Sequence, residues 1–246
     1  MNRLKLILSF VAMFMFVASA DAQFPFGMGG GSGKTATNAK RETRSVDDSY
    51  TKILANKGLN VAILQSDKNE IEVITDGCPT SDVITEVKKG VLTIKMKKVT
   101  KGSAVQVNVS LKDLESIEAK RGASISTECV FVRKGTFNVE VDAQSEVELE
   151  LECENLVLKS NSGRAVLTGE VGSMTADLRG AVGDMSLDAE NLKVKTIDMK
   201  ATSVNAVVCF SESLKVDAVG STITYIGDKE KVSATTSYGG KVAPKK

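Results

Sequence analysis

The chain has 246 residues, with 32 Lys and Arg against 31 Asp and Glu, and it contains neither His nor Trp. A formal net charge of +1 gives no electrostatic drive toward nucleic acid or an anionic membrane, so we expect no nucleic acid partner. The absence of His excludes Ser-His and Cys-His nucleophile pairs and histidine-ligated zinc sites.

The first segment, residues 1–22, has the three parts of a secretory signal peptide: a positively charged start, an apolar run over residues 6–17, and small residues up to Ala22. This order predicts export, with cleavage between Ala22 and Gln23. The apolar run is shorter than the roughly 20 residues of a spanning helix, and no long apolar stretch follows it. We therefore expect no membrane span after processing.

Residues 23–44 are rich in Gly at first and polar afterwards. Such a composition does not bury enough apolar surface to offset the entropy of ordering the chain, which predicts a flexible linker. The fragment Gly33-Lys34-Thr35 is not a phosphate-binding loop, because that motif needs a Gly where this chain has Met28.

From residue 45 onward, short runs alternate between apolar and polar residues, which is typical of half-buried strands. A motif x-Leu-x-Val/Ile then recurs with a period of about 18–23 residues, the mark of stacked repeats that bury a common core. The spacing predicts one all-β domain over residues 45–246, a parallel β-helix (β-solenoid) with coils of about 18–23 residues. Its N-terminal strands and cap are expected over 45–108 and its regular coils over 109–242. The motif is anchored at Leu114, Phe137, Leu156, Met174, Leu192, Leu214 and Val232.

The four cysteines form an even number, and an exported protein reaches a compartment that allows disulfides. Cys129 and Cys153 follow the anchors Leu114 and Phe137 at almost the same spacing, so we expect them in adjacent coils and as the candidate disulfide. Cys153 also continues an inward apolar series, and free Cys packs well as a small hydrophobe. A bridge and a pair of buried thiols therefore both stay open.

The densest acidic run extends from Glu146 to Glu154, with a carboxylate at every second residue on the outward face of one strand. Such a row could bind Ca²⁺, but ligands along a single strand favour a solvated face that discourages lateral sheet association. No metal site and no cofactor are predicted.

Asp177 and Asp217 each follow a motif anchor by three residues, two coils apart, with Lys195 expected between them. The separation of roughly 9 to 10 Å is wide for a retaining glycosidase pair and near the upper limit for an inverting one. Two surface carboxylates are the favoured interpretation, and no catalytic residue is predicted.

Four segments carry a resemblance to a known family. They read TEVKKGVLTIKMKK at 85–98, VNVSLKDLESIEAKRGASI at 107–125, ENLKVKTIDMKATSVNAV at 190–207 and ESLKVDAVGSTITYIGDKEKV at 212–232. The sequence resembles the exported bacterial family described as putative auto-transporter adhesin, head GIN domain. The resemblance implies a right-handed parallel β-helix and an envelope or surface location in a Gram-negative bacterium, and it carries over no catalytic residue.

Together these observations lead to one main hypothesis of function. We expect an exported protein of the periplasm, the cell surface or the medium that binds a glycan or a surface protein without catalysis. Two alternatives stay open: a polysaccharide-cleaving enzyme that uses carboxylates, and a purely structural envelope component.

Overall fold

The computed structural model describes residues 39–46, 49–98, 101–180 and 185–246. Within these ranges the protein is all-β, with two single-turn 3-10 helices and no α-helix. The predicted signal peptide, with its cleavage point between Ala22 and Gln23, lies outside the described residues, as does most of the predicted linker. The elements are β1 (Lys40–Arg44), β2 (Lys52–Asn56), β3 (Asn60–Gln65), β4 (Glu70–Asp76), η1 (Thr80–Asp82), β5 (Val83–Lys88), β6 (Val91–Met96), β7 (Ala104–Leu111), β8 (Ser116–Lys120), β9 (Ser124–Thr127), β10 (Phe131–Arg179), β11 (Met185–Thr202), β12 (Val204–Val219), β13 (Thr222–Ile226), η2 (Lys229–Lys231), β14 (Val232–Ser237) and β15 (Lys241–Pro244).

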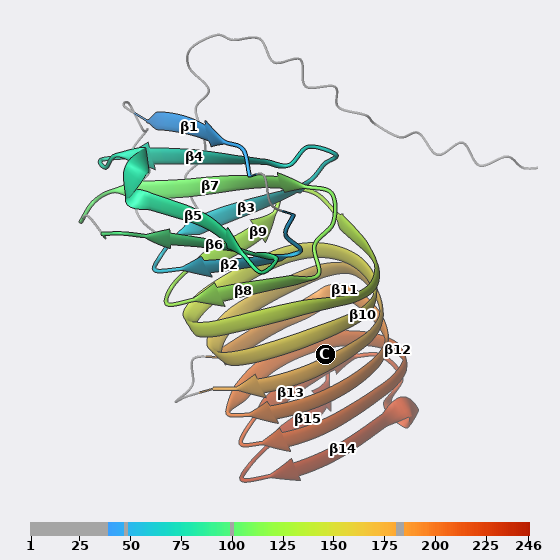
Figure 1. Ribbon diagram of the computed structural model, residues 1–246. Helices are drawn as coiled ribbons and strands as arrows, with labels where there is room; N and C mark the ends of the chain where they lie inside the picture. The colour runs from blue at the N-terminus through green and yellow to red at the C-terminus, as the bar shows by residue number, and fades with distance from the viewer. Residues whose placement is uncertain (1–38, 47–48, 99–100, 181–184) are drawn as a thin grey trace, which may run out of the picture. The chain divides into compact units, whose positions relative to one another are not determined.

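The strands form one mixed sheet of 15 strands, whose main order is β1-β4-β7-β3-β9-β10-β11-β12-β13-β15 (Figure 1). The pairs β1–β4, β4–β7 and β5–β6 are antiparallel, and the later pairs are parallel. The predicted right-handed parallel β-helix is therefore wrong for this chain. The antiparallel strands of the N-terminal part make the sheet mixed, and the sheet curls into a half-barrel instead of a solenoid.

The antiparallel part contains a tight hairpin between β5 and β6. Lys88 pairs with Val91, so the loop consists of Lys89 and Gly90 alone, with φ angles of 51° and 74°. Two consecutive residues with positive φ are typical of a type I′ turn, whose twist matches that of the flanking strands. This turn joins neighbouring strands directly, and they must therefore be antiparallel.

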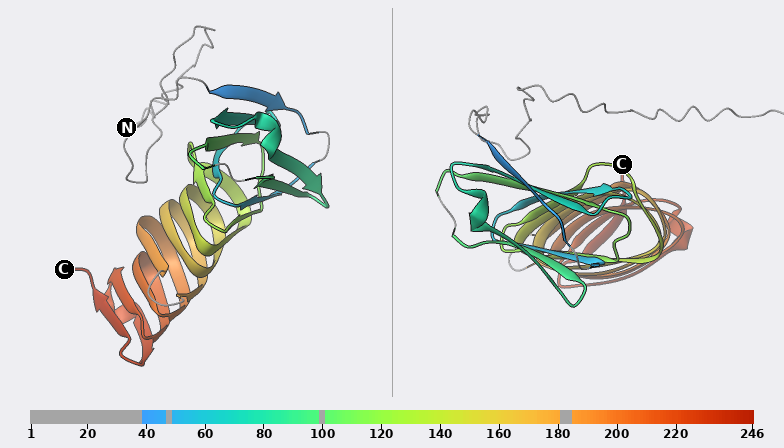
Figure 2. Two further views of the ribbon diagram at one scale, coloured as in Figure 1. Left: turned by 90° about the vertical axis from the view of Figure 1, so that its left-hand side faces the viewer. Right: turned by 45° about the horizontal axis from the view of Figure 1, so that its top comes forward.

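The long strands β10, β11 and β12 curve repeatedly, and we call each curved pass that pairs with the next pass a rung (Figure 2). The number of residues from one rung to the same place on the next varies. Arg164 on β10 pairs with Ser186 on β11, whereas Asn205 on β12 pairs with Thr222 on β13, which is nearer to it in the sequence. Buried and exposed side chains alternate along the rungs. A period of two residues places every second side chain in the core.

The core is a continuous stack of aliphatic side chains, and Phe131 and Phe137 contribute two tilted rings with centroids 5.8 Å apart. Leu114, Leu158 and Leu178 on successive parts of the stack are fully buried. Burying a side chain of this size contributes about 1.5–3 kcal/mol, so stability is distributed along the whole stack.

Strand β1 corrects the predicted end of the linker. The composition assigns residues 40–44 to the flexible segment, yet they pair with β4 along the whole strand. The Arg44 guanidinium donates hydrogen bonds to the carbonyls of Thr80 (3.0 Å) and Val83 (2.8 Å). Polar contacts, and not apolar burial, hold this strand to the sheet.

Candidate binding groove

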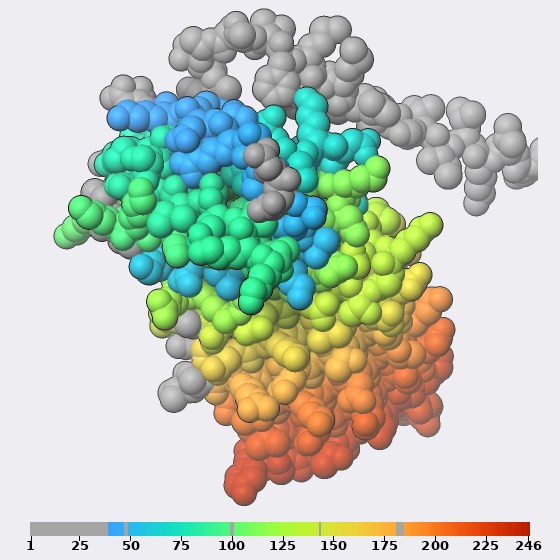
Figure 3. Space-filling model, in the orientation of Figure 1, coloured from blue at the N-terminus to red at the C-terminus, as the bar shows by residue number. Residues whose placement is uncertain are grey.

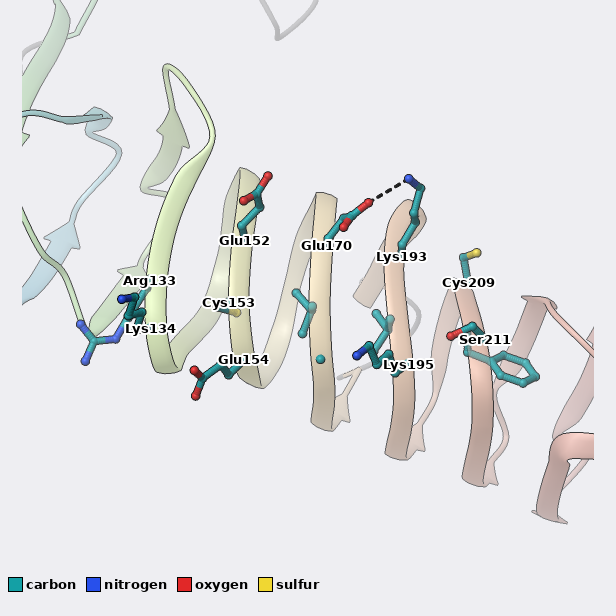
Figure 4. A pocket seen from close by; sticks show the side chains of 14 residues that line it. Arg133, Lys134, Glu152, Cys153, Glu154, Glu170, Lys193, Lys195, Cys209 and Ser211 are labelled. Carbon is teal, nitrogen blue, oxygen red and sulfur yellow. Dashed lines mark hydrogen bonds and ion pairs between the residues drawn. The ribbon is translucent and has the colours of Figure 1, made fainter. Parts of the chain in front are cut away.

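A groove of about 590 Å³ crosses five successive rungs where the chain turns a corner of the curled sheet (Figure 4). Each rung contributes two or three consecutive residues. They are Arg133 and Lys134, then Glu152 to Glu154, Glu170 to Gly172, Lys193 to Lys195 and Cys209 to Ser211. The groove therefore runs across the strands, and its length is four strand spacings, roughly 19 Å.

The floor of the groove is apolar. Val171 pairs with Val194, and Val194 pairs with Phe210, so the three side chains form one row from rung to rung. Each of these residues is at most 4% exposed. Cys153 is partly buried and packs against the same core, which extends the floor by one more rung.

One rim of the groove carries an ion pair. Glu170 and Lys193 are paired residues of neighbouring rungs, and the Lys193 Nζ donates a hydrogen bond to Glu170 Oε1 at 2.9 Å. This hydrogen bond raises the pKa of the Lys193 ammonium above its ordinary value. Both side chains remain well exposed, so the pair contributes little to stability and is available to a ligand.

The opposite rim contains a glycine. Glu154 and Lys195 line this side of the groove (Figure 4). Gly172 lies on the rung between theirs. A Cβ on Gly172 would lie 2.5 Å from the Glu154 carbonyl oxygen, which no real side chain tolerates. The close approach of the two backbones therefore requires Gly at this point of the rim.

Charge is distributed unevenly along the groove. The rung of Glu152 and Glu154 is acidic, and the rung of Lys193 and Lys195, two spacings away, is basic. Two spacings amount to roughly 9–10 Å. On the other side of the acidic rung, the Arg133 Nη1 donates a hydrogen bond to Asp113 Oδ1 at 2.5 Å. The groove thus offers an apolar floor between an acidic and a basic part.

Burial raises the pKa of the Cys153 thiol to about 11. The thiol is therefore protonated at neutral pH, and a protonated thiol is a poor nucleophile. In its reduced form, Cys153 therefore packs in the floor of the groove and does not act as a nucleophile.

The predicted disulfide between Cys129 and Cys153 stays a prediction. Both residues are thiols in the structure, each of intermediate exposure. The ladder between β9 and β10 ends at Ser126 and Glu148, before it reaches either cysteine.

The acidic run of β10 faces solvent, as its favoured interpretation predicts, with Glu148, Glu150 and Glu152 exposed. Glu146 forms an ion pair with Arg164. Among the residues that the structure describes, no group of three or more His, Cys, Asp or Glu side chains is arranged to hold a metal ion.

Asp177 and Asp217 lie on one outward row, but the lysine between them is Lys200, because Asp177 pairs with Lys200 and Lys200 with Asp217. The expectation that Lys195 occupies this place is wrong. The row of anchors runs from Met174 through Ile197 to Leu214, because this rung is longer than the repeat spacing suggests, and the presumed anchor Leu192 pairs with Gly169. Lys195 lies in the groove instead.

The repeat motif does not reveal the groove, although the sequence carries a signal for it. Triplets with an apolar or Cys centre recur on successive rungs as Glu-Cys-Glu, Glu-Val-Gly and Lys-Val-Lys, beginning at Glu152, Glu170 and Lys193. A search for catalytic residue types passes over such triplets, because the chain contains no His that could activate Cys153.

Solved structures of bacterial proteins share this architecture. A crystal structure of a putative adhesin from Bacteroides fragilis matches with a TM-score of 0.72 at 16% identity, covering 85% of this chain and 98% of that one. A putative adhesin from Parabacteroides merdae matches with a TM-score of 0.62 at 17% identity, covering 85% and 97%. A putative lipid binding protein from Parabacteroides distasonis matches with a TM-score of 0.60 at 18% identity, covering 85% and 98%. These likenesses show a shared fold.

A search of the curated proteins finds no match. In the part of the chain that the structure describes, no helix is long and apolar enough to cross a membrane. One family model covers residues 49–229, and it is the family that the sequence resembles. The chain belongs to the family described as putative auto-transporter adhesin, head GIN domain.

Proposed function

We propose that the chain is an exported, non-enzymatic binding protein of the cell envelope or surface, and that the groove binds an extended polypeptide segment of a partner protein. The observation that carries this proposal is the apolar row of Val171, Val194 and Phe210, which is preceded by an acidic rung and passes through a basic one. The family, whose description names an adhesin, supports a location outside the cytoplasm.

The chemistry of the lining favours a polypeptide over a glycan. An extended peptide places apolar side chains on one face, which suits an apolar floor, and charged side chains toward the rims. Sugar sites commonly add an exposed aromatic ring on which the sugar stacks, and Phe210, the one aromatic residue of the described lining, is only 4% exposed. Among the described residues of the lining, Ser211 is the one neutral hydroxyl or amide side chain.

A carbohydrate-cleaving reaction receives less support from the geometry. Such enzymes bring two carboxylates to opposite sides of one bond. Here Lys200 separates Asp177 from Asp217, and the Arg179 guanidinium donates hydrogen bonds to Asp177 at 3.3 Å. Asp177 is therefore a surface partner of Arg179, and a lysine lies between it and Asp217.

The test compares a random peptide library displayed on phage with a glycan array, each applied to the purified protein. We expect selected peptides to alternate apolar and charged residues. Lys195→Glu should weaken their binding about tenfold, because it reverses the charge of the basic rung. Lys200→Glu is the matched control, an exposed lysine on the same strand but outside the groove.

Two outcomes would contradict the proposal. One is glycan binding that depends on Lys195 while the peptide library yields no binder. The other is peptide binding that is equally strong in the Lys195→Glu and Lys200→Glu variants.

A further inference from the structure

The last rung leaves the core uncovered at the C-terminal end of the sheet. Strand β14 pairs with β12 in parallel, so that Val232, Ala234 and Thr236 extend the inward rows of Leu214, Val216 and Ala218. The three β12 side chains are at most 2% exposed, whereas Ala234 and Thr236 are exposed. Among the described residues no second strand pairs with β14, which lies at the lower end of the molecule, the red end in Figure 3.

The free edge of β14 lacks the usual protection of an edge strand. An edge presents unpaired N–H and C=O groups, and proteins guard it with charged residues or Pro. Strand β1, at the other end of the sheet, has four charged residues among its five, and β15 ends at Pro244. Strand β14 reads Val-Ser-Ala-Thr-Thr-Ser and contains neither.

We infer that β14 pairs with β14 of a second copy of this chain, antiparallel and about a two-fold axis at Ala234. In this register Ala234 faces the partner's Ala234, and Val232 faces the partner's Thr236. Side chains that point inward in one copy then lie beside inward side chains of the other, because an antiparallel pair about such an axis preserves the alternation. The pairing satisfies the free β14 edge of each copy and covers the C-terminal end of the core in each copy.

The charge pattern favours β14 of the second copy over its β1. Lys40, Arg41 and Glu42 of β1 would face an uncharged strand. Arg44 is already committed to the Thr80 and Val83 carbonyls of its own chain. Two β14 strands bring no like charges opposite one another. A two-fold pair also closes on itself, so it yields a dimer and no filament.

Tyr238, directly after β14, is 91% exposed. In the inferred register it lies opposite the partner's Glu230, next to the partner's Lys231. Tyrosine is enriched at protein interfaces because it combines a large apolar ring with a hydroxyl. The dimer would therefore cover the most exposed large side chain at this end.

The test measures the mass of the purified protein by sedimentation and light scattering over a dilution series. We expect a dimer that dissociates on dilution. Ala234→Lys and Ala234→Asp should each weaken the dimer about tenfold or more, because each puts two like charges opposite one another. An equimolar mixture of the two variants should dimerise again, since Lys then faces Asp.

Thr43→Lys is the control, an exposed residue on the guarded strand β1. Recovery of the dimer in the mixture also shows that both Ala234 variants are folded. A wild-type protein that is monomeric throughout the series overturns the inference. So does a dimer that both Ala234 variants retain, or one that only Thr43→Lys dissociates, or a mixture of the two charged variants that stays monomeric.

Discussion

Gly172 lies so close to Glu154 of the preceding rung that a single added carbon would meet the Glu154 carbonyl oxygen at 2.5 Å. The contact is between backbones, so neither partner can move aside by changing a rotamer.

The first prediction follows from this contact. Gly172→Ala should lower the free energy of unfolding by about 1–3 kcal/mol, because the two rungs must separate to accommodate the methyl group. Thermal or denaturant unfolding measures the loss. Thr175→Ala, an exposed position on the same strand, serves as the control and should change stability by less than about 0.5 kcal/mol. An unchanged free energy of unfolding in Gly172→Ala would contradict the close approach of the Gly172 and Glu154 backbones.

The second prediction concerns Tyr50, whose hydroxyl is buried and has no hydrogen-bond partner among the described residues. Burial raises the pKa of Tyr50 from 10.0 to about 12. The neutral phenol is favoured in the folded state, so its contribution is complete below pH 10 and is lost as the pH rises through about 12. Unfolding of wild type and Tyr50→Phe between pH 8 and 12 should show a steeper alkaline loss in wild type.

At neutral pH Tyr50→Phe should be neutral or slightly stabilising, because it removes a buried polar group that lacks a partner. Tyr238→Phe is the control for the loss of an exposed hydroxyl. Identical alkaline curves for wild type and Tyr50→Phe would contradict the prediction.

The third prediction concerns Arg44, which donates hydrogen bonds from Nε and Nη2 to Glu42 at 3.0 and 3.1 Å. This interaction lowers the pKa of Glu42 from 4.5 to about 2. A depressed carboxyl pKa gives stability that is present above pH 4.5 and is lost as the pH falls through about 2. Arg44→Met should therefore lower the melting temperature more at pH 6 than at pH 2.

The same substitution in a Glu42→Gln background separates the two roles of Arg44. There its effect should be the same at both pH values, since the remaining hydrogen bonds, to the carbonyls of Thr80 and Val83 and to the Thr85 hydroxyl, do not titrate in this range. A pH-dependent effect that persists without Glu42 would assign the acid sensitivity to another group.

The fourth prediction is the disulfide between Cys129 and Cys153. If the bridge forms after export, it closes the loop between the two cysteines and contributes about 3 kcal/mol. Peptide mapping without reductant should recover the linked peptides, and reductant should lower the melting temperature of wild type but not of Cys129→Ser. Mapping that finds both thiols unmodified would remove the bridge.

Strands along the stack can be predicted from the sequence because their aliphatic residues alternate strictly. The inward rows around Leu156, Met174 and Leu214 are buried as the motif indicates. The antiparallel pairs cannot be predicted in this way, because the same alternation describes a strand of either direction. The Lys89-Gly90 turn is the local signal for a hairpin, but Lys is not among the residues that typically open such a turn.

The alternation of apolar and polar residues predicts neither strand β1 nor the groove. Strand β1 has no apolar residue, and it is held by hydrogen bonds from Arg44 to carbonyls that are distant in sequence. The groove lies beside two register shifts, one between Val166 and Gly169 and one between Ala189 and Lys193. A constant period carries no information about where such a shift occurs.

The pairings of β2 and β3 set the order in which the chain can fold. Ile53 on β2 pairs with Ile117 on β8, and Val61 on β3 pairs with Ile125 on β9, so one edge of each early strand must wait for a partner that comes much later in the chain. Each subsequent rung pairs with the pass of the chain directly before it. Closing the long loops is the slower event, because its entropic cost precedes any gain from contacts.

We therefore expect Ile117→Val to slow refolding and Ile223→Val, near the other end, mainly to speed unfolding, as stopped-flow measurements over a range of denaturant would show. The N-terminal strands would then act as the template on which the remaining chain is laid down, one rung after another.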